Sequence, residues 1–110
     1  MIRGTTPTYT FEIDGYDLTG CTAYVTVKRN TTSVTKTNTD GSVIIIGDSQ
    51  GTTLLVTLTQ EDTLALKAGD AKVQVRWIDQ NGTAWATEIA DITVGRVLLE
   101  KVIEWGGDEP

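Results

Sequence analysis

The chain has 110 residues, enough for one domain, and its 39% hydrophobic and 22% charged residues are ordinary for a soluble globular protein. Fifteen acidic against nine basic side chains give a formal net charge of −6, which argues against binding nucleic acid or an anionic membrane. The absence of histidine and the presence of a single cysteine exclude histidine-based catalysis, a structural zinc site and an internal disulfide.

Strand is the predicted structure for most of the chain. Its twenty threonines favour strand, because a β-branched side chain suits a pleated sheet surface. Short alternating segments recur about every ten residues with turn residues between them, which is typical of a sandwich or barrel. In the first half of the chain we expect strands at residues 8–13, 22–29, 33–36, 43–46 and 53–58. The segment 33–36 has almost no apolar face, so we expect a short edge strand there. The continuous apolar run VIII at 43–46 is instead consistent with a buried strand.

The alternation stops in the segment LTQEDTLALKAGD. Thr59 followed by Asp62 resembles a capping box, in which two side chains satisfy backbone N–H groups at the start of a helix. We expect one short helical turn over residues 60–64 that crosses between two sheets. Leu64 or Leu66 would then plug the core.

A hairpin follows, with the turn residues DQNG between two alternating segments. A two-residue loop would set Glu88 opposite Val75 on the inner face, where burying a carboxylate is costly. A three-residue loop that ends in a left-handed glycine avoids this cost, and we prefer it. The preferred register pairs Trp77 with Trp85, Val75 with Thr87, and Val73 with Ile89, and it places both tryptophans in the core.

Beyond the hairpin the pattern changes. The apolar positions Ala90, Ile92 and Val94 have the opposite parity to Ile89, so we expect a β-bulge near Ile89 or Ala90. The next stretch, GRVLLEKVIEW, fits helix and strand equally well. We expect a single β-sandwich domain over residues 1–103 and a polar tail over residues 104–110.

Carboxylate pairs are the remaining candidates for catalysis, since two carboxylates can serve a glycosidase. A helix cap, a strand face and a loop explain them more simply; the pairs are Glu61 with Asp62, Glu88 with Asp91, and Asp14 with Asp17. Asp79 and Asn81 match part of a calcium loop, but the downstream glutamate is missing. Cys21 is expected to be a small buried side chain. We therefore predict no enzyme activity, no metal and no other cofactor.

Tryptophan could mark a binding face. Aromatic residues in a row on a sandwich face would stack on sugars, which makes a carbohydrate-binding module that recognises host cell-wall glycan the alternative function. Trp105 lies beyond the last strand pattern and could either anchor a neighbouring chain or fold back over the end of its own domain. The sequence favours neither reading of Trp105.

Three segments resemble a known group of proteins: MIRGTTPTYTFEI at the start, LTQEDTL in the middle and ITVGRVLLEKVI near the end. They look like small tail and baseplate proteins of phages and prophages of Firmicutes, and are similar to the N-terminal domain of baseplate upper proteins. The resemblance spans residues 1 to about 103. Baseplate upper proteins continue into long further regions, whereas this sequence stops at 110, so we expect a separate small tail protein.

What the resemblance implies is an immunoglobulin-like antiparallel β-sandwich of about seven strands that acts as a virion structural protein. Its partners would be other phage tail or baseplate proteins, with a homo-oligomer as a possibility, and it would be assembled in the bacterial host cytoplasm. No catalytic residue comes with this family. The residues expected to contact other proteins are Arg3, Arg96, Leu98, Leu99, Val102, Ile103 and Trp105.

Overall fold

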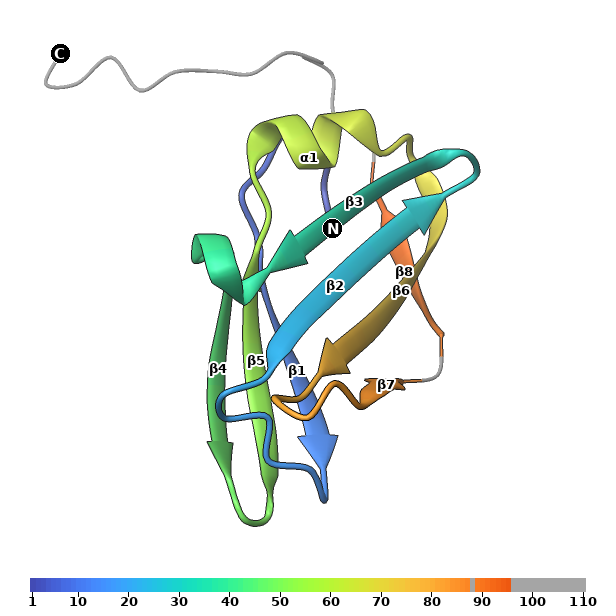
Figure 1. Cartoon of the computed structure of the whole chain (residues 1–110). Coiled ribbons are helices and arrows are strands. Elements are labelled where there is room, and N and C mark those ends of the chain that lie inside the picture. The colour runs from blue at the N-terminus through green and yellow to red at the C-terminus, as the bar shows by residue number, and fades with distance from the viewer. Residues whose placement is uncertain (88, 96–110) are drawn as a thin grey trace, which may run out of the picture.

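The computed structural model describes residues 1–87 and 89–95, and this part of the chain is an all-β sandwich of two antiparallel sheets (Figure 1). Two short helical segments interrupt the strands. The elements in chain order are β1 (Thr8–Asp14), β2 (Thr22–Arg29), β3 (Thr32–Thr37), the 3₁₀ turn η1 (Asn38–Asp40), β4 (Val43–Asp48), β5 (Gly51–Thr57), α1 (Gln60–Ala65), β6 (Gly69–Ile78), β7 (Ala84–Ala86) and β8 (Ala90–Val94).

The two sheets differ in size. One has three strands in the order β1-β5-β4, and the other has the order β3-β2-β6-β7, with β8 also pairing with β6. Every strand pairing is antiparallel, and β3 lies at the edge that its polar sequence predicts. Eight strands are described where about seven were expected, because the last alternating segment is divided into β7 and β8.

The core lies between the sheets and consists of the inward side chains of alternating segments. On β2 the buried residues are Ala23, Val25 and Val27, and on β5 Leu54 and Val56 take the same role. Burying such side chains is the main favourable term in folding, at about 25 cal/mol per Å². The alternation read from the sequence therefore assigns these strand faces correctly.

Each end of the sandwich is plugged by a fully buried leucine. At one end, Thr59 and Asp62 form the predicted capping box of α1, and Leu66 follows it with 0% of its surface exposed. At the other end, Leu18 in the β1–β2 loop is also 0% exposed. The Leu18 N–H donates to Thr52 Oγ1 at 2.9 Å, which holds the loop on β5.

The β6–β7 hairpin confirms the three-residue loop. Trp77 pairs with Trp85, the Asp79 N–H donates to the Thr83 carbonyl at 3.0 Å, and Gly82 has a φ of +83°. Only glycine adopts such a conformation without strain. Both the loop length and its chemistry were thus predictable from the sequence.

The predicted bulge is also present, and it changes one predicted pair. Val73 pairs with Ala90 rather than Ile89, so the register shifts by one residue between β7 and β8. The Thr87 N–H still donates to the Val75 carbonyl at 2.8 Å, while the Val75 N–H donates to the Thr87 side-chain hydroxyl at 3.1 Å. The Thr87 carbonyl accepts instead from the Gln74 amide at 2.9 Å.

Candidate functional site

An aromatic cluster lies at the end of the molecule that carries the β6–β7 hairpin. Tyr16, from the β1–β2 loop, lies 5.7 Å from Trp77 in an edge-on arrangement and 5.5 Å from Trp85 with the rings tilted by 53°. Such geometries suit the quadrupoles of aromatic rings. Contacts among the three rings therefore pack the β1–β2 loop against the β6–β7 hairpin.

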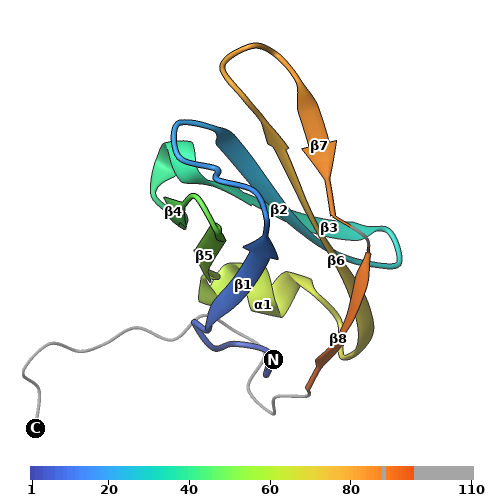
Figure 2. The same ribbon diagram turned by 90° about the horizontal axis from the view of Figure 1, so that it is seen from below.

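The prediction that both tryptophans are buried is half wrong. Trp77 is 5% exposed, but Trp85 is 41% exposed and Tyr16 45%. Trp85 does face inward with Trp77, and Tyr16 packs against it, but the hairpin reaches beyond the three-stranded sheet (Figure 2). The rings of Tyr16 and Trp85 are tilted against each other by 53°, so the two do not lie in one plane.

Arg3 is buried, with 5% of its surface exposed, and it bonds the end of α1. Its Nε donates to the Leu66 carbonyl at 2.8 Å and its Nη2 to the Leu64 carbonyl at 2.6 Å. Leu64 lies in the last turn of α1 and Leu66 is its C-cap, a place where arginine commonly satisfies free carbonyl acceptors. The predicted contact of Arg3 with another protein stays a prediction, but within the chain this residue has a structural task.

The first residues are also tied to the end of β8. The Arg3 N–H donates to the Gly95 carbonyl at 3.0 Å, and the Gly95 N–H donates to the Met1 carbonyl. Ile2 and Gly95 form an isolated parallel bridge. The N-terminal residues thus hold α1 and β8 together.

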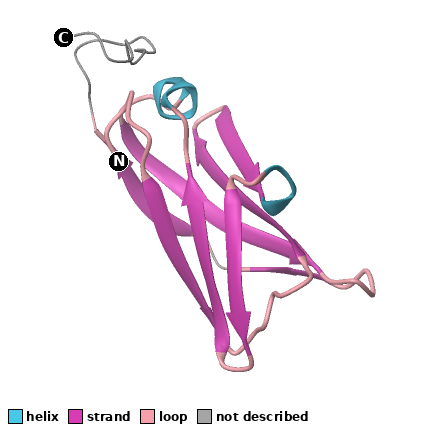
Figure 3. Ribbon diagram, turned by 90° about the vertical axis from the view of Figure 1, so that its left-hand side faces the viewer, coloured by secondary structure: helices cyan, strands magenta, loops and turns pink. Residues whose placement is uncertain are grey.

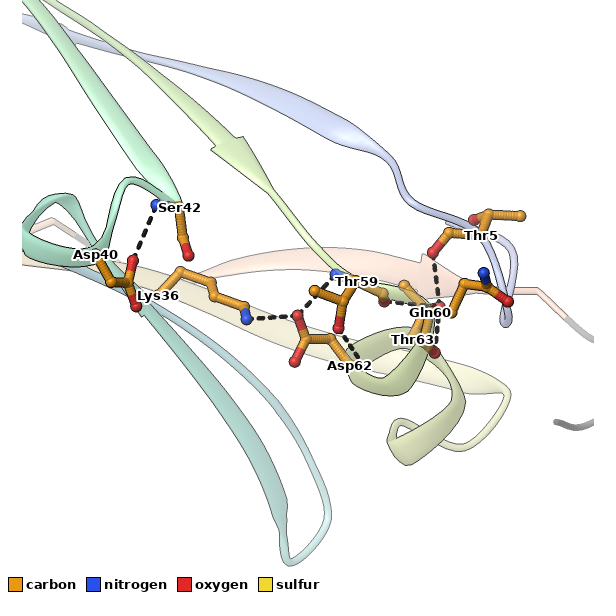
Figure 4. A network of polar contacts seen from close by, with 8 residues as sticks. All are labelled: Thr5, Lys36, Asp40, Ser42, Thr59, Gln60, Asp62 and Thr63. Carbon is orange, nitrogen blue, oxygen red and sulfur yellow. Dashed lines mark hydrogen bonds and ion pairs between the residues drawn. The ribbon is translucent and has the colours of Figure 1, made fainter. Parts of the chain in front are cut away.

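A polar network joins β3 to α1 (Figure 4). Lys36 Nζ lies 2.6 Å from Asp62 Oδ2, and both side chains are mostly covered, with 15% and 16% exposed. The same carboxylate oxygen accepts from the Thr59 N–H at 2.8 Å, and Thr63 Oγ1 donates to the Thr5 carbonyl at 2.9 Å. The network links the five-stranded sheet, the helix and the segment before β1.

Each described carboxylate with a shifted pKa has that pKa lowered. Partial burial alone would raise the pKa of Asp62, but bonds from Lys36 and Thr59 outweigh it and lower that pKa. Hydrogen bonds from Thr19 lower the pKa of Asp17, and those from Ser42 lower that of Asp40. A general acid needs the opposite shift.

Asp62 and Asp17, from two of the candidate carboxylate pairs, have structural roles. Asp62 caps α1 as predicted, and Asp17 accepts from the Thr19 N–H within its own loop at 3.0 Å. Glu88 and the side chain of Asp91 lie outside the described residues.

Cys21 is half-buried rather than fully buried, and it packs against the core. Burial raises the pKa of its thiol, and the carboxylates of Asp79 and Asp17 raise it further. Because the thiolate is the reactive form, this surrounding suppresses nucleophilic chemistry.

A small hollow of about 180 Å³ opens between β1 and β6. Phe11, Ile13, Val73 and Val75 contribute its apolar lining. Ligand sites for drug-sized molecules span about 300–1,000 Å³, so this hollow is below that range. Among residues 1–87 and 89–95, no three potential ligand side chains gather to hold a metal, and no helix there is long and apolar enough to cross a membrane.

Three exposed isoleucines lie at the margins of the sheets. Ile44 and Ile46 of the edge strand β4 are 53% and 58% exposed. Ile89, between β7 and β8, is 63% exposed. These margins are candidate contact surfaces that the sequence reading of "VIII" as a buried strand missed, although alternation within that run would have indicated them.

The other predicted contact residues cannot be placed. Six of them lie outside the described residues, namely Arg96, Leu98, Leu99, Val102, Ile103 and Trp105. The prediction that their segment is either helix or strand falls outside the described residues too.

Comparisons of the chain with protein-family models, with curated proteins and with solved structures found no match.

Proposed function

We propose that the chain is a non-enzymatic structural component of a phage tail or baseplate, acting through protein–protein contacts in virion assembly. The observation that carries the contact role is the set of large apolar side chains exposed at the sheet margins, Ile44 and Ile46 above all. Exposed apolar groups in a cluster mark interaction surfaces. The phage assignment rests on the resemblance of the three sequence segments.

The same proposal includes the finer statements that the resemblance implies. The sandwich is immunoglobulin-like, its partners are tail or baseplate proteins, and its location is the virion after assembly in the host cytoplasm. The downward pKa shifts of Asp17, Asp40 and Asp62 and the raised pKa of the Cys21 thiol support a role without catalysis.

Co-expression with the products of neighbouring genes tests this function. We expect one such product to co-elute with the chain in size-exclusion chromatography, and antibodies to detect the chain in purified particles. Replacing Leu99 and Ile103 by aspartate should abolish co-elution, whereas Lys101→Ala, in the same segment, should leave it unchanged. A folded chain that binds none of these products and is missing from particles would refute the proposal.

A carbohydrate-binding module is the second candidate, and the exposure of Tyr16 and Trp85 favours it. If it is correct, iodide quenches Trp85 emission strongly and added cell-wall glycan protects it, while a Trp85→Phe variant loses the protection. Trp77, which is buried, serves as the internal control. Quenching that glycan leaves unchanged would rule out this candidate at the aromatic cluster.

A further inference from the structure

The edges of the sheets are not protected equally. Proteins guard exposed edge strands with charged residues, proline or bulges, because unpaired backbone groups invite another strand. The edge strand β1 carries Glu12 and Asp14, and β3 carries Lys36 in its ion pair with α1. In β4, by contrast, no charged residue or proline occurs until Asp48. Figure 3 looks onto this side of the molecule.

The backbone of β4 has hydrogen-bonding groups that point away from its sheet. The Thr57 N–H donates to the Ser42 carbonyl at 3.0 Å, which fixes the alternation of the β4–β5 ladder. Within β4, residues with even numbers therefore bond β5. Residues with odd numbers point their N–H and C=O groups to the other side, where no strand lies among residues 1–87 and 89–95. Between residues 43 and 47 the odd-numbered residues are Val43, Ile45 and Gly47.

The side chains of β4 match this open edge. Ile44 and Ile46 lie on the outer face of the sheet, next to Leu55 and Thr53 of β5. A strand added at the edge would cover both isoleucines and satisfy the backbone groups at the same time.

We propose that this edge pairs with β4 of a second copy of the chain, antiparallel and about a two-fold axis at Ile45. This deepens the proposed contact function, on which it rests, by naming one partner. The register sets Ile45 opposite Ile45 of the second copy, and Val43 opposite its Gly47. The outward N–H and C=O groups of one β4 therefore face those of the other and can form backbone hydrogen bonds. It also sets Ile44 opposite Ile46, which makes a continuous apolar ladder on one face.

Charge is compatible with this register, and the response to salt separates a second copy from a basic foreign strand. Asp48 falls opposite Ser42, which directly precedes β4, so no two carboxylates face each other in this ladder. Each copy nevertheless carries a net charge of −6, and the two repel each other at long range. Salt screens this repulsion and should strengthen a dimer of identical copies, whereas it would weaken capture of a basic foreign strand.

The size of the interface sets the expected affinity. A six-residue strand is roughly 20 Å long, and a stable interface buries about 800 Å² on each partner. Pairing through one strand covers less than that. We therefore expect a reversible dimer with a dissociation constant between about 10 μM and about 1 mM.

Sedimentation equilibrium from about 1 μM to about 1 mM chain tests the pairing. We expect a monomer–dimer equilibrium that tightens several-fold when the salt rises from about 0.05 M to about 0.5 M. The double variant Ile44→Lys, Ile46→Lys should weaken it at least about tenfold. Ile89→Lys changes an equally exposed isoleucine on the other sheet and should leave it unchanged, and circular dichroism confirms that both variants fold.

Cysteine cross-linking tests the register. In a Cys21→Ala background, a mixture of Ile44→Cys and Ile46→Cys chains should form a disulfide with each other faster than either forms with itself. Three results would overturn the pairing. The chain could be a monomer at every concentration, the double lysine variant could dimerise as tightly as the original chain, or added salt could weaken the dimer. Those outcomes leave co-elution with tail proteins unaffected, so failure of the pairing and failure of the proposed function are distinguishable.

Discussion

The two ends of the sandwich are closed by different means. Both have a leucine at 0% exposure, Leu66 after α1 and Leu18 in the β1–β2 loop. The helix end is held by charged groups, through Arg3 and the Lys36–Asp62 pair. At the hairpin end, on the opposite side in Figure 1, aromatic rings pack around Trp77 and the Leu18 N–H bonds Thr52. One core can thus be closed by charged hydrogen bonds at one end and by aromatic packing at the other. The two ends should therefore lose stability in response to different substitutions and to different changes of pH.

The largest expected effect is at the hairpin end. Trp77→Ala should lower the free energy of unfolding by about 3–5 kcal/mol, because it removes a buried ring and leaves a cavity. Trp85→Ala removes a ring that is 41% exposed and should cost about 1 kcal/mol. Denaturant unfolding followed by circular dichroism measures both. Equal losses would mean that Trp85 is as well covered in solution as Trp77.

A smaller effect is expected at the helix end from Arg3→Met. It leaves the Leu64 and Leu66 carbonyls without their charged donor and should cost about 2 kcal/mol of unfolding free energy. Arg29→Met is the control, since the described contacts give the half-buried Arg29 guanidinium one hydrogen bond, to the Asp70 carbonyl, against two carbonyls for Arg3. A control that loses as much as Arg3→Met would contradict the anchoring role.

The smallest effect is the pH response of the Lys36–Asp62 pair. The folded state lowers the pKa of Asp62, so the carboxylate stabilises the fold above the ordinary aspartate value of 3.8, and this stability is lost as the pH falls through the lower folded value. Asp62→Asn should therefore cost about 1 kcal/mol near pH 7, and the two unfolding curves should converge at about pH 2. Lys36→Met, which removes only the ion pair, should cost less. A difference that persists in acid would show that the cap does not depend on the charge.

Local pattern predicted most of the fold. Alternation assigned the inward faces of β2 and β5, and the parity of the Trp77 hairpin gave its loop and the following bulge. Thr59 and Asp62 predicted the helix cap, because the two hydrogen bonds of the cap join residues only three positions apart. These features depend on neighbours in the chain or on one adjacent strand.

The features that were missed depend on distant parts of the chain. The exposure of Trp85 is decided by how far the opposite sheet extends, which no pattern in residues 73–89 contains. Arg3 reaches carbonyls more than sixty residues away, and no local motif marks that task. The openness of β4 follows from the order of the strands in its sheet, and apolar composition alone suggested burial.

The bridge between residues 1–3 and residues 93–95 has a mechanical consequence. The described fold begins and ends at neighbouring points, while β1 and β8 belong to different sheets. Tension applied at Arg3 and Gly95 would load this short bridge first and would reach the two sheets only after it opens. Under force the described fold should thus unfold in two steps: the bridge between the two ends breaks first, and the two sheets separate at a higher force.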